Sequence, residues 1–284
     1  MRSLPGDSYA LFSLVSPHGD QGYPGELLTE VLVSLVPSSA GKLGSVVIVY
    51  RCRLNGREKV VTSVNLTQHW GFNLEASLSG GKQLEAASVK EHELMIGADY
   101  IANLDGYYLP TGEYTPVSIR PSHDFWEPSL IGKFPTSGYN DYFLFDDSLV
   151  YPSPRRAGLS DLQSLNLLDD ILNHDDIGGP PSVRLESKKA GIALQFFSNQ
   201  RGVMFYSNFL AEPNNGARKN IHGGSGVTGE GDSYSPWTAA FLEFHEPLAA
   251  FLRPENRDGE DTLLASGELY NNFVRLEIEQ IARP

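Results

Sequence analysis

The stretch that decides the fold is "SVVIVYRCRLNGREKVVTSVNL", from Ser45 to Leu66. It is rich in Val, Ile and Thr on both sides of Asn55-Gly56, and β-branched residues suit a pleated, half-buried strand. Asn-Gly tolerates the positive φ angles of a tight two-residue turn. The stretch therefore predicts a β-hairpin from Ser45 to Leu66.

Strand signals continue outward from this hairpin along the rest of the chain. A second pair of strands is expected around Asn199 to Arg201, and two more strands in "AAFLEFHE" and "NFVRLEIEQIA". The best helix signal is "SDLQSLNLLDDILNH", with Ser160 as a possible N-cap. The 28 glycines and 18 prolines fit many short strands joined by turns. We expect an all-β fold, a large antiparallel β-sandwich forming one domain over residues 1–284.

Composition narrows the class of protein. The chain has 284 residues, of which 40% are hydrophobic, so a large core is expected. A formal net charge of -13 repels phosphate backbones and argues against a nucleic-acid partner. Cys52 is the only cysteine, which suits a reducing compartment. We see no secretion signal and no apolar run of membrane-spanning length, so we expect a cytoplasmic protein without a membrane partner.

An unusual segment follows the predicted hairpin, "NLTQHWGFNLEAS", Asn65 to Ser77. It places His69 beside Trp70 and Phe72, in a pattern that neither helical nor strand periodicity explains. One interpretation is a packed corner with a hydrogen-bonded histidine. The other is a proton donor in a sugar pocket. The residues of this segment alone leave both interpretations open.

Several segments, in order, resemble the aldose 1-epimerases, also called galactose mutarotases. They are "SPHGDQGYPGELLTEVLVSL" (Ser16 to Leu35), "NLTQHWGFNL", "YLPTGEYTPV" (Tyr108 to Val117), "GYNDYFLF" (Gly138 to Phe145), "FSNQRGVMFYSNFL" and "FLEFHEPLAAF". "HWGFNLEAS" and "FLEFHEPLAAF" are most similar to fungal members. The resemblance covers nearly the whole chain and implies a large twisted β-sandwich, in agreement with the strand signals.

The resemblance also implies the chemistry. Mutarotation needs a base for the C1 hydroxyl proton and an acid for the ring oxygen of an aldose, and it requires neither cofactor nor metal. His69 matches the family's acid and Glu243 its base. Trp70 and Phe72 are expected to give an apolar wall for the sugar. We expect His69 and Glu243 to face each other across a sugar-sized gap.

Other positions depart from the family pattern. Roughly the first quarter of a typical family member, which precedes the Gly-Tyr-Pro-Gly segment, has no counterpart here. Because that part includes several strands of the sandwich, we expect unpaired edges and exposed apolar faces. It also carries an Arg and a His that help to bind the sugar, so we expect weak mutarotation. The family's sugar-binding Asp aligns with Asn140, and Asp141 follows it. For Asp141 to take over, a local bulge would be needed, since it starts on the opposite face of a strand. Met204 stands where many relatives have Gln.

Three functions remain open. The first is an aldose 1-epimerase-like enzyme acting on a small aldose such as galactose or glucose. The second is a catalytically impaired or non-catalytic relative that binds a carbohydrate. The third is a hexose-6-phosphate mutarotase, for which Arg184, Lys188 and Lys189 are the nearest basic cluster. No pair of histidines has metal-ligand spacing, and we expect no metal site.

Overall fold

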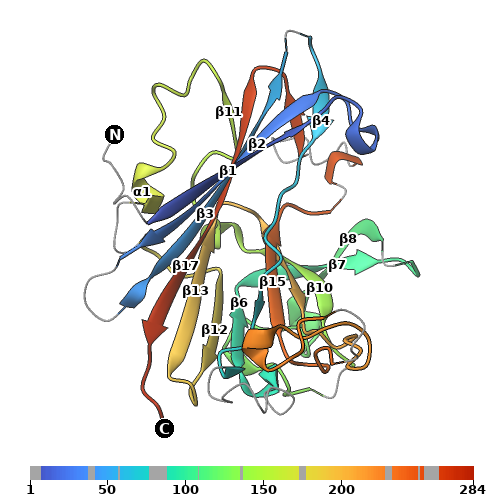
Figure 1. The fold of residues 1–284 in the computed structure, drawn as a ribbon, viewed down its shortest axis with the longest axis vertical. Helices are drawn as coiled ribbons and strands as arrows, with labels where there is room; N and C mark the ends of the chain where they lie inside the picture. The colour runs from blue at the N-terminus through green and yellow to red at the C-terminus, as the bar shows by residue number, and fades with distance from the viewer. Residues whose placement is uncertain are drawn as a thin grey trace.

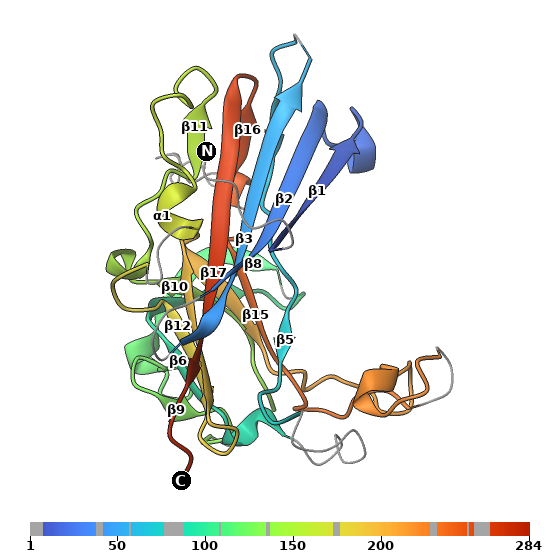
Figure 2. The same cartoon turned by 60° about the vertical axis from the view of Figure 1, so that its left-hand side comes forward.

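The computed structural model describes residues 8–37, 42–56, 58–76, 88–107, 109–134, 137–172, 177–227, 232–248, 250–252 and 262–284. In this part of the chain the strands form two main antiparallel sheets and a small pair (Figures 1 and 2). This confirms the predicted antiparallel β-sandwich. Among the described residues the only α-helix is the short α1 (Asp169–Leu172).

The strands of the larger sheet lie in the order β1 (Tyr9–Ser16), β2 (Glu26–Val36), β3 (Lys42–Asn55), β17 (Glu268–Gln280), β13 (Ile192–Ser198), β12 (Val183–Ser187), β6 (Glu93–Ile96) and β9 (Ser129–Leu130), with β11 (Arg156–Gly158) also paired to β17. The smaller sheet has the order β5 (Gly71–Phe72), β15 (Ala240–His245), β14 (Gly202–Tyr206), β10 (Asn140–Phe145), β7 (Ala98–Leu104) and β8 (Pro110–Pro116). A two-stranded sheet pairs β16 (Leu263–Ala265) with β4 (Val61–Ser63).

Short 3₁₀ helices punctuate the connections between these strands. They are η1 (Asp20–Gly22), η4 (Val89–Glu91), η5 (Val117–Ile119), η6 (Asp147–Leu149), η7 (Asn220–His222) and η8 (Ala250–Leu252).

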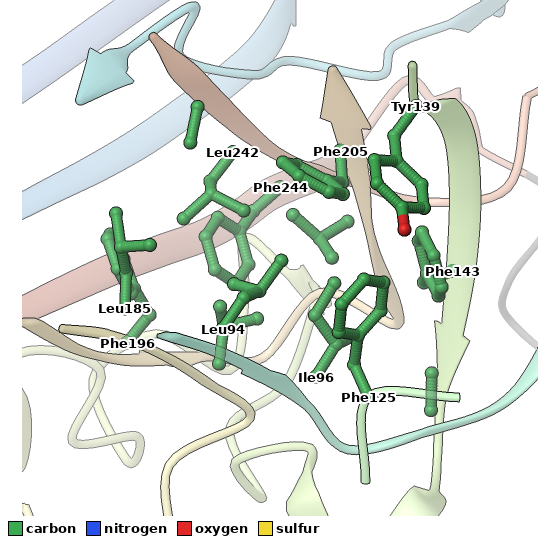
Figure 3. Close-up of a cluster of buried hydrophobic side chains, with 14 of the residues drawn as sticks. Leu94, Ile96, Phe125, Tyr139, Phe143, Leu185, Phe196, Phe205, Leu242 and Phe244 are labelled. Atoms are coloured by element: carbon green, nitrogen blue, oxygen red, sulfur yellow. The ribbon is translucent and has the colours of Figure 1, made fainter. Parts of the chain in front are cut away.

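The main core fills the space between the two sheets (Figure 3). Successive side chains of a strand point to opposite faces of its sheet, so every second residue points into this space. Leu94, Leu185 and Phe196 enter from the larger sheet, while Phe205 and Phe244 enter from the smaller one. A second cluster packs α1 against the outer face of β3 and β17.

The predicted hairpin from Ser45 to Leu66 is wrong. Strand β3 pairs with β2 on one side and with β17 on the other, so both of its edges are occupied. After a turn in which Gly56 has φ 97°, the chain continues to β4, which pairs with β16 instead. The Asn-Gly turn predicts where the chain reverses direction, but it does not predict which strand the following segment pairs with.

The second predicted pair is also wrong, because β13 and β14 belong to different sheets. The turn between them is a buried corner that moves the chain from one layer to the other. Asn199 donates to the carbonyl of Asn271 at 3.0 Å and accepts from the amide of Phe273 at 3.0 Å. These bonds hold the corner against β17 and leave β14 free to enter the smaller sheet.

The long helix expected from Ser160 does not form over the described residues. Turns occupy residues 159–164, and the Ser160 hydroxyl donates to Asp161 instead of capping a helix. The Asn166 side chain accepts from the amide of Asp169, the first residue of the short helix α1, at 2.9 Å. The expected N-cap at Ser160 is therefore wrong, because its side chain bonds to Asp161 within a turn and no helix begins there.

Strands β1 and β2 lie at the margin of the larger sheet, away from β10 and β15 of the smaller one (Figure 2). On the face that β3 turns toward the core, Phe12 and Leu14 of β1 are 60% and 66% exposed. Leu35 of β2 continues this apolar face and is also exposed. Edge strands with exposed apolar side chains favour association with other apolar surfaces.

This surface leads to a testable prediction. We expect the chain to bind the dye ANS and to self-associate, and the double variant Phe12→Thr/Leu14→Thr to reduce both strongly. Threonine keeps the preference for strand structure while removing most of the exposed apolar area. ANS fluorescence and size-exclusion chromatography measure the two effects. Val274→Thr, in the buried core, is the contrasting substitution, and it should increase dye binding by loosening the fold. Unchanged ANS binding by the double variant would show that this face is not the site.

Candidate active site

Glu243 lies on the outer face of the smaller sheet. Along β15 the side chains of Ala240, Leu242 and Phe244 are buried in the core, so those of Phe241 and Glu243 project to the opposite face. Glu243 pairs with Met204 of β14. Its side chain is 14% exposed. The carboxylate is thus partly desolvated but still reachable from solvent.

His69 lies directly opposite Glu243. Strand β5 pairs with β15 through Phe72↔Ala240 and Gly71↔Phe241, and His69 continues this register toward Glu243. The His69 Nε2 atom is 2.9 Å from the Glu243 Oε1 atom. The His69 side chain is 69% exposed, and its ring centroid lies 5.0 Å from that of Phe241. The expected sugar-sized gap between the two side chains is absent: they are in contact.

Trp70 and Phe72 do not form a wall beside this pair. Both pack against the core between the sheets, and Phe72 contacts the ring of Phe196 edge-on at a centroid distance of 5.5 Å. Because Phe72 pairs with the buried Ala240, its side chain shares the inward face. The expectation of a sugar wall from these two residues is therefore wrong.

Two aromatic residues on the outer face, Phe241 and Tyr206, lie in the row next to Glu243, and the sequence analysis did not identify them. They are cross-strand partners, and their ring centroids are 5.8 Å apart at an interplanar angle of 33°. The signal was present in the sequence. In "AFLEFH" the alternation that directs Glu243 outward directs Phe241 outward as well.

Asn140 shares the outer face with Glu243, whereas Asp141 does not. Asn140 pairs with Tyr206, and Asp141 pairs with the buried Phe205. The pairing of β10 with β14 runs through these residues without a shift, so the bulge that Asp141 required is absent. Instead, the Asp141 Oδ2 atom lies 3.3 Å from the Nε2 atom of His123. Asp141 is thereby occupied on the inner side of the sheet.

A pocket on the outer face adjoins the row that contains Glu243. Asn140, Tyr142 and Met204 form its floor, and Met204 is the cross-strand neighbour of both Tyr142 and Glu243. Its walls include Leu104 and Glu113 from the β7–β8 region, and Leu248 after β15. The lining is mostly apolar, with Asn140 as the amide in its floor.

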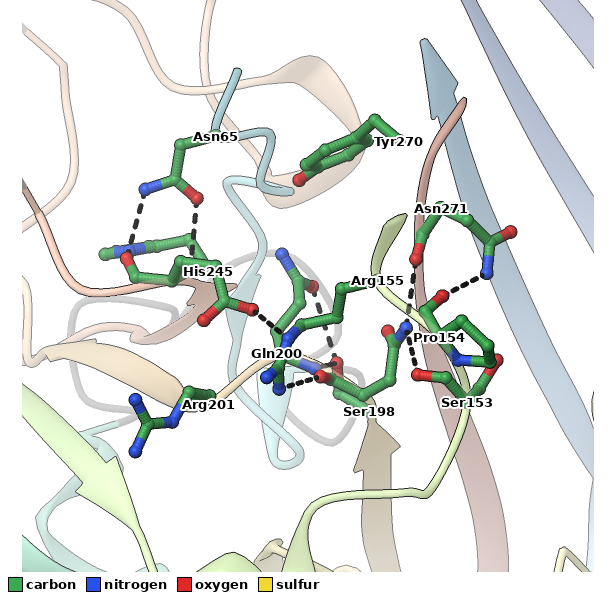
Figure 4. Close-up of polar contacts among 12 residues, drawn as sticks. Asn65, Ser153, Pro154, Arg155, Ser198, Gln200, Arg201, His245, Tyr270 and Asn271 are labelled. Atoms are coloured by element: carbon green, nitrogen blue, oxygen red, sulfur yellow. Dashed lines mark hydrogen bonds and ion pairs between the residues drawn. The ribbon is translucent and has the colours of Figure 1, made fainter. Parts of the chain in front are cut away.

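A second glutamate, Glu246, follows three residues after Glu243 and has a different environment, formed by Asn65 and Arg155, which are labelled in Figure 4. Its backbone amide donates to Asn65 Oδ1 and its carbonyl accepts from Asn65 Nδ2, both at 3.0 Å. Its buried carboxylate lies 3.6 Å from Arg155 Nε. The backbone of Glu246 therefore anchors the segment that carries His69, and its carboxylate is engaged with an arginine. The carboxylate of Glu243 instead contacts His69.

The surroundings of Glu243 affect its acidity. Burial raises the pKa of its carboxyl above the ordinary value of 4.5, and neighbouring His69 pulls the pKa partly back down. A raised pKa in the folded state means that ionising Glu243 costs stability. The stabilisation that protonated Glu243 gives the fold is fully present below the pKa of this group in the unfolded chain. It is lost as the pH rises through the higher pKa in the folded protein.

We therefore expect His69→Ala to raise the pKa of Glu243 further, because it removes the group that favours the carboxylate. Titration of ¹³C-labelled glutamate side chains by NMR measures this directly. His222→Ala is the control, since His222 contacts Tyr234 in a different region and should leave Glu243 unchanged. A Glu243 pKa that stays constant or falls in His69→Ala would contradict the coupling.

Two broader features concern cations and membranes. Among the described residues, no three His, Cys, Asp or Glu side chains gather as ligands of a metal ion would. Within the same part of the chain, no helix has the length and apolar character to cross a bilayer.

Comparison with known proteins gives one consistent family. The aldose 1-epimerase family model matches residues 2–276. The chain is 28% identical over 202 residues to galactose mutarotase of Homo sapiens, covering 70% of this chain and 46% of that protein. It is 33% identical over 204 residues to the galactose mutarotase of Bos taurus, with coverage of 70% and 46%. The chain thus spans about half the length of the curated relatives it matches.

Solved structures support the fold. An aldose epimerase homologue from C. elegans superimposes with a TM-score of 0.67 at 17% identity, over 98% of this chain and 68% of that one. Galactose 1-epimerase from Lactobacillus acidophilus gives a TM-score of 0.63 at 16% identity, over 99% and 66% of the two chains.

Proposed function

The chain belongs to the aldose 1-epimerase family, and from this premise we propose that it interconverts the α and β anomers of a free aldose. The observation that carries the proposal is the contact between His69 Nε2 and Glu243 Oε1 at 2.9 Å on the outer face of the smaller sheet. An acid and a base at one small site are the groups that ring opening needs.

The proposed reaction has two proton transfers in each direction. Glu243 takes the proton from the C1 hydroxyl while His69 protonates the ring oxygen O5, and the C1–O5 bond breaks. Rotation about the C1–C2 bond of the open-chain aldehyde presents its other face. As the ring closes, O5 returns its proton to His69 and O1 receives the proton held by Glu243. The two residues end as they began, so no covalent intermediate is needed.

The direct contact between the two residues has a consequence for this reaction. A sugar has to enter between them, so their contact must open before the acid and base act. His69 is the more exposed partner, and we propose that its ring turns outward to admit the substrate. Part of the binding energy is then used to separate the pair, which fits a weak mutarotase.

The groups proposed to hold the sugar lie in two rows on the same face. Phe241 and Tyr206 offer ring faces to the apolar side of a pyranose, and Asn140, the next residue in their row, offers an amide to a hydroxyl. Met204 lies between Glu243 and Tyr142 and supplies no hydrogen-bonding group comparable to an amide. Orientation of the sugar therefore rests on few polar contacts.

A neutral aldose such as galactose or glucose is the proposed substrate, in the cytoplasm. The basic cluster that favours a phosphorylated sugar is engaged elsewhere. On the larger sheet, Arg184 of β12 contacts Glu186 and Glu279, each at 3.0 Å. Beyond that strand, Lys188 contacts Glu93 and Lys189 contacts Glu75. With a net charge of -13, the protein has little attraction for a phosphate.

Two observations favour a second candidate function, a non-catalytic carbohydrate-binding relative. The acid and base are paired with each other, and the face around them is poor in polar groups, as Met204 illustrates. In that case the aromatic pair Phe241 and Tyr206 would bind a sugar without accelerating its mutarotation.

Polarimetry on freshly dissolved α-D-galactose tests the proposal. We expect the protein to accelerate the change in rotation above the spontaneous rate, more weakly than the galactose mutarotase of Bos taurus measured at the same concentration. No acceleration, together with sugar binding detected by calorimetry, would favour the non-catalytic relative.

A further inference from the structure

The point at which β5 separates from β15 has an unusual hydrogen-bonding arrangement. In a regular antiparallel ladder, every second pair of opposite residues exchanges both backbone hydrogen bonds. The amide of Leu242 donates to the carbonyl of Trp70 at 3.2 Å, as such a ladder requires. The carbonyl of Leu242, however, accepts from the side-chain amide of Gln68, Nε2, at 3.2 Å. A side chain thus continues the ladder beyond the end of β5.

Gln68 is held from the other side as well. Its Oε1 atom accepts from the hydroxyl of Tyr50 at 3.3 Å. Tyr50 is buried on β3 of the larger sheet, while Leu242 belongs to β15 of the smaller one. Gln68 is itself only 5% exposed. Its amide therefore bridges the two layers with both a donor and an acceptor satisfied, which fixes the side chain in one orientation.

The position of this bridge is significant because of its sequence neighbours. Gln68 immediately precedes His69, and Leu242 immediately precedes Glu243. In an extended chain, adjacent side chains point to opposite faces, so Gln68 enters the interior while His69 projects outward. A histidine as exposed as His69 has few contacts to hold it, and the placement of its backbone decides where the ring can reach.

We propose that Gln68 is a positioning residue that holds His69 opposite Glu243. It acts through the backbone, by tying residue 68 to residue 242, and it touches neither the substrate nor the reacting atoms. The catalytic importance of this arrangement rests on the proposed function, but the placement of His69 beside Glu243 does not.

Other buried amides tie the same segment at a distance from His69. Gln200 donates through Nε2 to the carbonyl of Leu66 at 2.9 Å. The side chain of Asn65, labelled in Figure 4, bonds to the backbone of Glu246. These contacts fix the beginning of the segment and do not reach Leu242. Gln200, fully buried like its neighbour Asn199, therefore provides a matched control for Gln68.

The test compares Gln68→Met with Gln200→Met. Methionine keeps the length and volume of glutamine but makes no comparable hydrogen bond, so both variants lose thermal stability. Only Gln68→Met is expected to raise the pKa of Glu243 in a ¹³C NMR titration, toward the value measured in His69→Ala. In polarimetry, Gln68→Met should lower kcat by about 10- to 100-fold at a nearly constant KM.

Tyr50→Phe is the milder companion variant, because it removes only the hydroxyl that bonds to Gln68. It should shift the Glu243 pKa in the same direction by a smaller amount, even if Gln68→Met folds poorly. A Glu243 titration that is unchanged in Tyr50→Phe and in folded Gln68→Met would overturn the proposal. So would equal shifts in Gln68→Met and Gln200→Met, since they would indicate general loosening. If the parent chain shows no mutarotation, the proposed function fails, while the titration still decides the role of Gln68.

Discussion

Glu243→Gln is expected to return the mutarotation of α-D-galactose to its spontaneous rate. Glutamine preserves the shape of the side chain but cannot take the proton from the C1 hydroxyl. General acid–base groups contribute typically about 10²–10⁴-fold, so losing one removes the acceleration that a weak mutarotase has to offer. His69→Ala should have the same result, because ring opening needs the acid as much as the base. Polarimetry at several protein concentrations separates the catalysed rate from the background.

The matched control for this loss is Glu246→Gln. Glu246 lies three residues further along the chain, is buried, and faces Arg155 instead of the outer face of the sheet. We expect Glu246→Gln to lose stability while keeping the catalysed rate per folded molecule. Glu243→Gln with a rate equal to that of the parent protein would refute the assignment of the base. Equal losses in both variants would attribute the effect to folding.

The strand-rich architecture was largely predictable from the sequence, because alternation of core-facing and outward-facing residues directly indicates a strand. In "AFLEFH" and "GVMFY" every second residue enters the core, and these segments form β15 and β14. The same alternation assigns Glu243 to the outer face without any knowledge of its partner. The proximity of His69 needed the family resemblance, since local patterns do not specify a contact between residues so far apart in sequence.

The errors share a physical cause, which is that local signals do not specify long-range partners. Asn55-Gly56 predicts a reversal, but β17 and β2 already occupy both edges of β3. Trp70 and Phe72 were expected at the site because they flank His69, yet the pairing of Phe72 with buried Ala240 turns that side chain inward. Pairing register, which depends on the whole sheet, decided the face of each residue.

The direct contact of His69 with Glu243 was also unpredictable from sequence. It depends on where β5 ends and on the bond from Gln68 to Leu242, neither of which leaves a local signature. The contact between His69 and Glu243 therefore depends on the pairing register of β5 and β15. Two strands from distant parts of the chain meet, and a buried amide extends their pairing far enough to place His69 beside Glu243.

The largest stability effect is expected at Glu277 on β17. Its carboxylate lies 2.9 Å from Arg275 Nη2 and 2.5 Å from Lys42 Nζ, and the side chains of Arg275 and Glu277 are both 0% exposed. Arg275 also donates to the carbonyl of Ile171 in α1. Glu277→Ala would leave the guanidinium buried without its counter-charge, and breaking a buried pair in this way costs about 3–5 kcal/mol. Urea denaturation measures the loss as a lower transition midpoint at a similar slope.

The double variant Arg275→Met/Glu277→Leu separates the cost of an unpaired charge from the value of the pair. Buried ion pairs gain little net stability, because desolvation offsets their attraction, so replacing both partners by apolar groups should recover most of the loss. Lys42 is 18% exposed and can turn its ammonium group to solvent. Glu93→Ala, which removes the partner of the exposed Lys188, should destabilise far less than Glu277→Ala. A double variant as unstable as Glu277→Ala would mean that the pair itself, with its link to α1, stabilises this layer of the fold.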